Sequence, residues 1–472
     1  MILGTLIYDG DCGFCLQSKD LLARLDHHGR VALLPLQDPG ATELSGVSRT
    51  ELAESLHWVG ADGKRTTGAE AVNTALAAVT GSGLPVTLYR LPVIRQVQDR
   101  TYRWVAEHRG RLGSLTARFS RRSTVVDATK LVSKLPPSVN TKFARTLFNL
   151  PAPIRKALSG RPIRLDGQTL DPDMRLLLRL LELQGIDGLS APGGPPLARK
   201  HLVENGPAVD VPRIEPVYAS TMQIGELRSR LYTPAGLADG SPLLVFFHGG
   251  GWVIGDLDTH DNACRFLAQN AGVRVLSVDY RVAPEFPFPA AVDDALTAYH
   301  YARAHAAELG ADPRMIAVGG DSAGGNLAIV TGLLADPDFV LAFYPSTSPE
   351  PTRSRKELFP SGFFITDKDM DYFADYYCPP KQRTDIRFAP ALADDLSGMP
   401  PTYIATAGFD PLRDDGEAFA AKLAEAGVPV VLRRHRDLIH GYINMLGVGP
   451  RPAQALAEAA GTLRSAFAMP TS

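Results

Sequence analysis

The sequence predicts an α/β protein of two domains, a small one at the N-terminus and a large, doubly wound one in the last two thirds. Its 472 residues exceed the ~100–200 residues of an ordinary domain. Strand-like apolar runs alternate with helical patterns on both sides of a stretch rich in arginine and proline. In the C-terminal part these apolar runs are uninterrupted and rich in β-branched residues, which is typical of parallel strands buried on both faces.

The composition is that of a globular protein, with 45% hydrophobic and 21% charged residues. Since 49 basic residues balance 51 acidic ones, no overall field would attract nucleic acid, and we expect no nucleic-acid partner. The start "MILGTLIYDGDC" lacks a basic leader, and no apolar run approaches the ~20 residues of a membrane span. Four cysteines do not make a secreted disulfide framework. We therefore expect a cytoplasmic protein without stable membrane insertion, whose oligomeric state the sequence does not indicate.

The N-terminal domain, residues 1–112, is expected to be a thioredoxin-like α/β sandwich. Short strands are predicted at "LGTLIY" and "VALLPLQ", on either side of the helical pattern "FCLQSKDLLARL". The run "LHWVGADGKRTTG" has the pattern of a hairpin around Asp62 and Gly63, and "AEAVNTALAAV" returns to a helical pattern. The order of strand, helix, strand, helix, hairpin and helix predicts the sandwich.

The stretch "YDGDCGFC", residues 8–15, places two cysteines where the first strand meets the first helix. Unpaired N–H groups and the helix dipole would stabilise a thiolate at Cys12, and Cys15, one turn on, is placed to resolve a mixed disulfide. The alternatives are half of a zinc site and two inert thiols. The sequence contains no second cysteine pair, and zinc usually takes four ligands. We expect redox chemistry with a thiol or disulfide partner at Cys12, and no metal or cofactor.

This stretch, with "HWVGADGKRTTGAEAV" and "YRWVAEHRGRL", resembles the DCC family of thioredoxin-like proteins over residues 1 to about 112. Asp9, Cys12 and Cys15 match the Asp-Cys-Cys signature of that family. The resemblance implies thiol–disulfide oxidoreductase activity. The run "ESLHWVG" before the hairpin contains no proline of the kind that faces a thioredoxin dithiol, so the way in which this domain would hold a partner stays open.

Residues 113–160 are predicted to be a basic, proline-containing linker with short helices. The run "RGRLGSLTARFSRRS" is rich in arginine, and "KLPPSVN" and "NLPAPIRKALSG" are interrupted by proline. A solvated linker face explains the arginines better than a patch for anions or lipid.

Residues 161–472 are expected to form the large domain, with a cap and entrance over 161–215 and a catalytic core over 216–472. Strands are predicted at "SPLLVFF", "VRVLSVDY", "RMIAVGG", "FVLAFYP" and "PTYIATAG". Helical patterns such as "AAVDDALTAYHYARAHAAEL" and "EAFAAKLAEAG" separate them. This alternation predicts a large sheet with helices on both faces.

The motif "GGDSAGGN" contains Gly-x-Ser-x-Gly around Ser322. The strand "RMIAV" precedes it and the helical run "GNLAIVTGLLA" follows, so the serine lies on a sharp turn from strand to helix. Such a turn needs glycines beside the serine, and it exposes the hydroxyl at the edge of the sheet. Ser322 is the predicted nucleophile.

A serine hydroxyl becomes nucleophilic when an imidazole takes its proton and a carboxylate orients that imidazole. In folds with such a Gly-x-Ser-x-Gly turn between strand and helix, the carboxylate and the imidazole both follow the serine in the chain. Asp410 lies just beyond the strand "PTYIATAG", and His440 lies in a loop after "VVLRRH". The competitors are Asp414 and Asp415, in the next helical turn, and His435, within or at the end of the strand. We predict Asp410 and His440 as the partners of the serine.

The tetrahedral intermediate of acyl transfer needs hydrogen-bond donors for its oxyanion. The motif "HGGGW", which follows the strand "LLVFF", contains consecutive glycines whose N–H groups a substrate can approach closely. Gly250, Gly251 and Ala323, the residue after the nucleophile, are the predicted oxyanion donors.

Five motifs, "HGGGWVIGDLDTHD", "SVDYRVAPEFPFPAA", "GGDSAGGNLA", "AGFDPLRDDG" and "HGY", resemble the hormone-sensitive-lipase family of α/β-hydrolase carboxylesterases, in its GDSAG branch, from about residue 165 onward. The resemblance implies a serine carboxylesterase for short-to-medium acyl esters, with a cap beginning at "LDPDMRLLLRLLELQGI". Two alternatives stay open. Thiol exchange could be the main activity with the hydrolase domain as its partner, or the dithiol could be a redox sensor that modulates the esterase.

Overall fold

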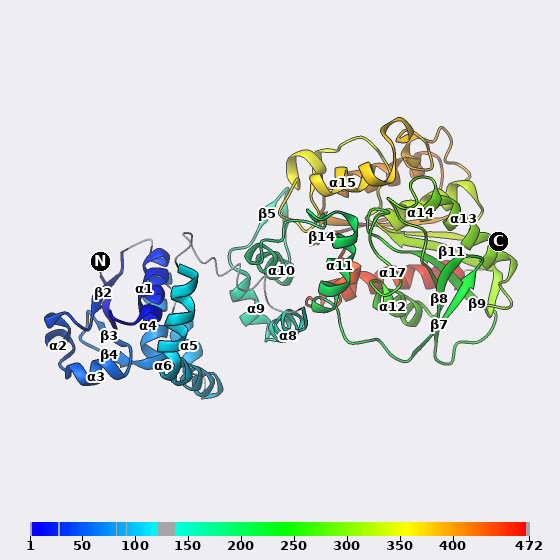
Figure 1. Cartoon of the computed structure of the whole chain (residues 1–472). Coiled ribbons are helices and arrows are strands. Elements are labelled where there is room, and N and C mark those ends of the chain that lie inside the picture. Colours follow the sequence, from blue (N-terminus) through cyan, green and yellow to red (C-terminus); the bar gives the residue numbers. More distant parts are fainter. Residues whose placement is uncertain (1, 27–28, 82, 91, 121–136, 469–472) are drawn as a thin grey trace. The chain divides into compact units, whose positions relative to one another are not determined.

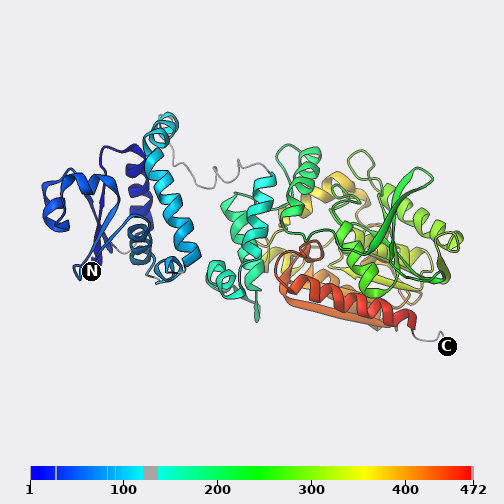
Figure 2. The same ribbon diagram turned by 90° about the horizontal axis from the view of Figure 1, so that it is seen from below.

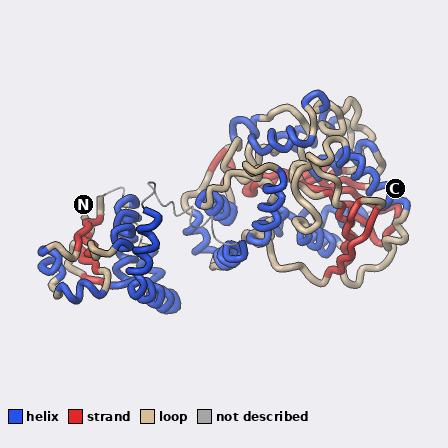
Figure 3. Tube along the Cα trace, viewed as in Figure 1, coloured by secondary structure: helices blue, strands red, loops and turns tan. Residues whose placement is uncertain are grey.

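The computed structural model describes residues 2–26, 29–81, 83–90, 92–120 and 137–468 and divides into two compact units, residues 1–127 and 128–472. Each unit has its own sheet with helices around it (Figures 1 and 3). Residues 121–136 of the predicted linker lie outside this description, as do the side chains of residues 109–140. The predicted basic face of the linker falls within those residues.

The first unit is a four-stranded sheet in the order β2-β1-β3-β4, with β1 parallel to β2 and antiparallel to β3. Leu6 and Trp58 pack on one face of the sheet, and Ile7 and Val59 pack on the other. This arrangement is the predicted sandwich. Its strands are β1 (Gly4–Tyr8), β2 (Val31–Pro35), β3 (His57–Gly60) and β4 (Arg65–Thr67), and its helices are α1 (Gly13–Leu25), α2 (Pro39–Ser45), α3 (Arg49–Glu54), α4 (Gly68–Thr80), α5 (Leu84–Tyr89) and α6 (Pro92–Ser120).

Helix α6 continues beyond residue 112, where the sequence placed a domain boundary. Residues 113–120 contain no proline, so no residue there removes a helical hydrogen bond. Residues 137–160, assigned to the linker, form α8 (Pro137–Phe148) and α9 (Ala152–Ser159) of the second unit. An ion pair of 2.6 Å between Arg155 and Asp173 joins α9 to α10.

The second unit is an eight-stranded sheet in the order β14-β13-β12-β11-β9-β10-β8-β7, in which β8 is antiparallel to both of its neighbours and the other pairs are parallel. The strands are β7 (Val217–Ile224), β8 (Leu227–Pro234), β9 (Ser241–Phe247), β10 (Arg274–Val278), β11 (Ala311–Asp321), β12 (Phe339–Phe343), β13 (Thr402–Phe409) and β14 (Val430–Ile439). The helices around it are α12 (Asp261–Ala271), α13 (Ala290–Ala304), α14 (Ala323–Leu334), α16 (Arg413–Glu425) and α17 (Arg451–Ala468).

Two hydrophobic cores lie on the two faces of this sheet. Successive side chains of a strand point to opposite faces, so Val245 joins the core formed with α13, α14 and α16, and Phe246 joins the core formed with α12 and α17. The C-terminal helix α17 is red in Figure 2. Among the described helices, none is both long and apolar enough to cross a membrane.

A small hairpin and three cap helices complete the second unit. A small hairpin, β5 (Arg164–Leu165) and β6 (Gln168–Thr169), precedes the cap helices α10 (Pro172–Leu183) and α11 (Pro195–Asn205). A third cap helix, α15 (Asp367–Tyr377), follows β12. The sequence analysis placed the cap in residues 161–215 alone, and α15 lies outside that range.

Candidate active site

Ser322 lies on a strained turn between β11 and α14, with φ 55° and ψ −117°. Its N–H donates to the carbonyl of Phe343 at 2.9 Å. A Cβ on Gly324 would lie 2.0 Å from the carbonyl oxygen of Phe247, so the strand approaches the turn too closely for any side chain. The glycine is thus required by the packing of the turn on β9, as the sequence predicts.

A chain of hydrogen bonds connects Ser322, His440 and Asp410. The His440 ring places Nε2 3.0 Å from Oγ of Ser322 and Nδ1 2.8 Å from Oδ2 of Asp410, and all three side chains are buried. The other carboxylate oxygen accepts the N–H of Leu412 at 2.8 Å. Because a carboxylate only accepts, Nδ1 carries the proton and Nε2 is free to accept from the serine hydroxyl. The arrangement can therefore remove a proton from Ser322.

The competing residues belong to other networks. His435 is buried on β14, where loss of solvation lowers its pKa to about 4. Asp414 pairs with Arg413 at 2.9 Å. Asp415 accepts an N–H and a hydroxyl from Thr347, and burial raises the pKa of this carboxyl to about 6 despite those bonds.

The glycine loop after β9 approaches the nucleophile. Gly249 donates its N–H to Oδ1 of Asp321 at 2.7 Å, so that group is already used. Gly250 and Gly251 have φ of 118° and 61°, and within the described chain their N–H groups donate to no protein acceptor. Ala323 is the first residue of α14, where an N–H has no intrahelical partner. These three predicted donors all line the cavity that contains the serine.

Asp321 also lies 3.1 Å from Nε2 of His260, and both side chains are buried. Burial favours the neutral acid, but His260 and the Gly249 N–H outweigh it and hold the pKa of Asp321 below its usual value. Sequence analysis missed this pair, since folding alone brings the two residues together. The available signal was an acidic residue directly before the predicted nucleophile.

The serine opens into a cavity of about 1220 Å³, lined by the cap helices and the glycine loop. Leu177 and Leu181 of α10 line it, as does Phe373 of α15. A Cβ on Gly251 would lie 2.3 Å from the Phe373 ring, so α15 rests directly on the glycine loop. Trp252, the next residue, also lines the cavity. Because α15 lies on this loop and contributes Phe373 to the lining, it forms part of the roof of the cavity.

Helix α15 is attached to the rest of the cap through its first turn. Thr366 and Asp369 form a reciprocal capping box at the start of the helix. Asp369 also accepts the N–H of Ser190 at 2.7 Å, which ties α15 to the segment between α10 and α11. The two parts of the cap are thus connected by a buried carboxylate.

In the first unit, Cys12 is the N-cap residue of α1, and its sulfur accepts the N–H of Cys15 at 3.4 Å. Both cysteines are partly exposed. The Gln37 amide donates to Asp9 at 3.0 Å and to Asp11 at 2.9 Å, and so connects the loop before Cys12 to the end of β2. Among the described residues, no group of three or more potential ligands is arranged to hold a metal ion.

The second unit is similar to proteins of known family. The model of the α/β hydrolase fold matches residues 244–444. Carboxylic ester hydrolase LipN of Mycobacterium tuberculosis is 42% identical over 334 residues, which cover 67% of this chain and 88% of that protein. The chain belongs to the hormone-sensitive-lipase family of α/β-hydrolase carboxylesterases. Carboxylesterase NlhH of the same organism is 38% identical over 316 residues, covering 63% of this chain and 96% of NlhH.

Solved structures of this carboxylesterase family share the fold. An ester hydrolase from the Lake Arreo metagenome, in complex with a bipyridine phosphonate derivative, is 36% identical, with a TM-score of 0.59 over 64% of this chain and all of that one. A thermostable esterase from Pseudomonas putida is 32% identical, with a TM-score of 0.58 over 63% of this chain and 97% of that one.

The N-terminal unit has a separate match. The model of the DCC1-like thiol-disulfide oxidoreductase matches residues 6–115. Both family resemblances stated from the sequence are therefore confirmed, and this member of the carboxylesterase family carries a DCC1-like domain before its hydrolase domain.

Proposed function

We propose that the second unit hydrolyses short-to-medium acyl esters of small molecules through Ser322, His440 and Asp410. The observation that carries the proposal is the hydrogen-bonded chain from the serine hydroxyl to the imidazole at 3.0 Å and on to the carboxylate at 2.8 Å. Its position at a cavity under an apolar cap supports an ester as the substrate.

In the acylation step, His440 takes the hydroxyl proton while Oγ of Ser322 attacks the ester carbonyl carbon. The carbonyl oxygen becomes an oxyanion and accepts N–H bonds from Gly250, Gly251 and Ala323. The imidazolium, stabilised by Asp410, then gives its proton to the alcohol oxygen as the C–O bond breaks.

In the deacylation step, a water molecule attacks the acyl-enzyme carbonyl while the imidazole takes its proton. The proton passes to Oγ of Ser322 as the acyl–oxygen bond breaks, which releases a carboxylic acid and restores the enzyme. The carboxylate of Asp410 stays ionised throughout and keeps the imidazole in one tautomer.

The test is hydrolysis of p-nitrophenyl esters over a series of acyl lengths. Ser322→Ala and His440→Asn should each lower kcat by ~10⁴-fold or more, because the nucleophile or its base is lost. The matched control is His435→Asn, a change of the same kind on β14, which should keep kcat within about threefold because its ring lies outside this chain of hydrogen bonds. A well-folded wild type that hydrolyses no ester of the series would refute the proposal. A rate that rises steadily through long chains would refute the acyl preference.

We propose a second function for the first unit, thiol–disulfide exchange at Cys12. The observation that favours it is the location of this half-exposed thiol at the start of α1, where its sulfur accepts a backbone N–H. The Cys12 thiolate attacks one sulfur of a disulfide and displaces a thiolate. Cys15 then attacks the mixed disulfide, releases the second thiol and leaves the Cys12–Cys15 disulfide.

The test is mass spectrometry of the protein after incubation with oxidised glutathione. The wild type should lose two hydrogens, whereas Cys15→Ser should retain one glutathione on Cys12, because the mixed disulfide has no resolving thiol. No change in either protein would refute the exchange. Ester hydrolysis by the reduced and oxidised forms decides whether the dithiol also acts as a sensor, and equal kinetics would eliminate that role.

A further inference from the structure

The turn that carries Asp410 is held at both ends by one residue, through its backbone and its side chain. Arg413 donates its backbone N–H to the carbonyl of Asp410 at 3.1 Å, and Nη1 of its guanidinium donates to the carbonyl of Gly408 at 3.3 Å. The Arg413 side chain is 3% exposed, and its guanidinium lies over the ring of Phe359, 5.1 Å from its centre. One arginine therefore spans residues 408–413, with the carboxylate at the middle of the span.

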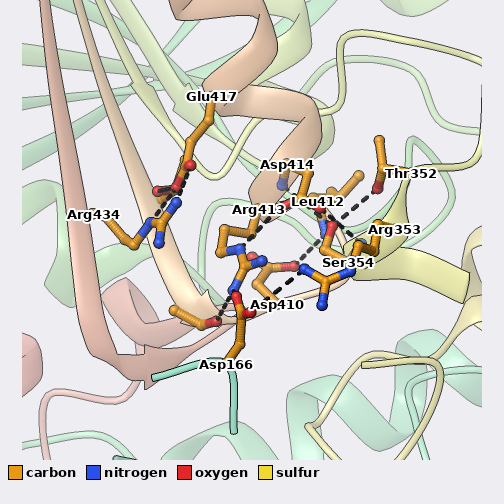
Figure 4. A network of polar contacts seen from close by, with 12 residues as sticks. Asp166, Thr352, Arg353, Ser354, Asp410, Leu412, Arg413, Asp414, Glu417 and Arg434 are labelled. Carbon is orange, nitrogen blue, oxygen red and sulfur yellow. Dashed lines mark hydrogen bonds and ion pairs between the residues drawn. The ribbon is translucent and has the colours of Figure 1, made fainter. Parts of the chain in front are cut away.

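The guanidinium is anchored in turn by the β5–β6 hairpin. Nη1 of Arg413 lies 2.9 Å from Oδ2 of Asp166, at the tip of the hairpin, and Nε lies 2.9 Å from Asp414 (Figure 4). Burial favours the neutral form of Asp166, but Arg413 and Arg353 outweigh it and keep the pKa of this carboxyl below its usual value. Gln168 of the hairpin adds a second donor to the carbonyl of Gly408 at 3.0 Å.

The same hairpin contacts the strand that leads to His440. The register between β13 and β14 shifts after Ala407, so that β14 has two extra residues there. Arg436, in this bulge, donates to the carbonyl of Gly167 at 3.1 Å, and the carbonyl of Asp437 accepts the N–H of Asp171 at 2.9 Å. Both strand ends that carry the imidazole and its carboxylate are thus fastened to one short segment before the cap.

We propose that Arg413 is a positioning residue for the acid of the triad, and that the β5–β6 hairpin, through Asp166, is its anchor. The inference rests on the proposed esterase function. Neither residue lines the cavity that contains Ser322. They set the separation between the Asp410 carboxylate and the His440 ring, which must stay near 2.8 Å to stabilise the imidazolium. Asp166 lies outside residues 244–444, so part of the machinery lies before the family match.

The test compares Asp166→Asn with Glu417→Gln, each expressed in the full chain. Asp166 has φ 53°, a conformation that asparagine adopts readily, so the variant should fold. Glu417 pairs with Arg434 and likewise joins α16 to another element, but it makes no bond to the 408–413 turn (Figure 4). Hydrolysis of p-nitrophenyl butyrate should show kcat about tenfold lower in Asp166→Asn with KM unchanged, since a misplacement of ~1 Å costs up to ~10²-fold. Glu417→Gln should stay within about twofold of the wild type, because the ion pair that it removes does not hold the 408–413 turn.

Two further readouts separate positioning from a loss of stability. The acid limb of the pH profile of kcat/KM should move to lower pH in Asp166→Asn, because a displaced carboxylate stabilises the imidazolium less. Arg413→Lys should recover part of the activity lost in Arg413→Met, since the ammonium keeps the charge but not the fork. If Arg413→Met does not fold, Asp166→Asn carries the test alone.

Equal kcat and an unmoved pH profile in Asp166→Asn and the wild type would overturn the inference while leaving the esterase function intact. If the wild type hydrolyses no ester, the proposed function fails instead. The inference is then judged by the low-field proton resonance of the His440 Nδ1–H, which reports the bond to Asp410 without turnover. Its loss in Asp166→Asn alone supports positioning, and its presence in all variants overturns it.

Discussion

Gly408→Ala should lower the activity by moving two strand ends apart. A Cβ at this position would lie 2.3 Å from the carbonyl oxygen of Arg436, and that neighbour is backbone, which cannot rotate away. Since Cβ contacts below 3.0 Å are essentially never seen, β13 and β14 must separate by at least 3.0 − 2.3 = 0.7 Å. If the whole shift reaches the site, the bond of 2.8 Å between His440 and Asp410 lengthens to 2.8 + 0.7 = 3.5 Å, the outer limit of a hydrogen bond.

We expect kcat for p-nitrophenyl butyrate to fall by about 10²-fold, and the free energy of unfolding to fall by about 1–3 kcal/mol, as is usual for an overpacked core. KM should change little, because the cavity is untouched. The matched control is Gly461→Ala in α17, where a Cβ meets nothing within 4 Å. That variant should keep full activity and gain about 0.5–1 kcal/mol from helix propensity. A Gly408→Ala enzyme with kcat within threefold of wild type would refute the idea that this strand contact sets the distance between acid and base.

Three more predictions follow from burial. Since the pKa of Asp415 is raised to about 6 in the folded state from ~3.9, the folded carboxyl binds its proton first as pH falls from 7 to 4. Wild type should then gain up to about 3 kcal/mol of stability relative to Asp415→Asn, measured by urea unfolding, and a difference independent of pH would contradict this. Native protein should show two thiols that react with Ellman's reagent, Cys12 and Cys15. The other two cysteines, Cys264 and Cys378, are 0% exposed, and burial raises the pKa of Cys378 to about 11. Four reactive thiols in the native protein would contradict this prediction. Arg155→Met should lower the free energy of unfolding by about 1–3 kcal/mol, because Asp173 loses the partner that joins α9 to α10, and an unchanged urea midpoint would show that α9 adds nothing to the stability of the second unit.

The arrangement of the sheet and the candidate triad could be anticipated because each depends on local sequence. The strand ahead of Ser322 is continuous and apolar, its turn is marked by glycines, and the order of serine, aspartate and histidine follows from the fold. To prefer His440 over His435, it was enough to predict where the last strand ends. In the structure His435 lies within β14. The hairpin at Asp62 and Gly63 was equally local, since a turn with these residues has few alternatives.

The remaining features depend on contacts between distant residues. Nothing in the run around Asp166 indicates that it meets Arg413, and nothing in the run around Phe373 indicates that it rests on Gly251. Helical periodicity predicts that α15 buries one face but does not say against which partner. The end of the first domain was predicted at residue 112 from a change in composition. Helix α6 continues past that residue to Ser120, because no proline interrupts its hydrogen bonds there.

The carboxylate of Asp321 has a consequence for how a substrate is received. It accepts the N–H of Gly249, and Ser322 is the next residue in the chain, so this hydrogen bond joins the glycine loop to the serine turn. The orientation of the predicted oxyanion donors is therefore set in the folded protein, and on the proposed mechanism little reorganisation energy remains for the moment of reaction. Discrimination between esters must then arise elsewhere, in how the cap and its α15 roof admit and orient the acyl and alcohol parts.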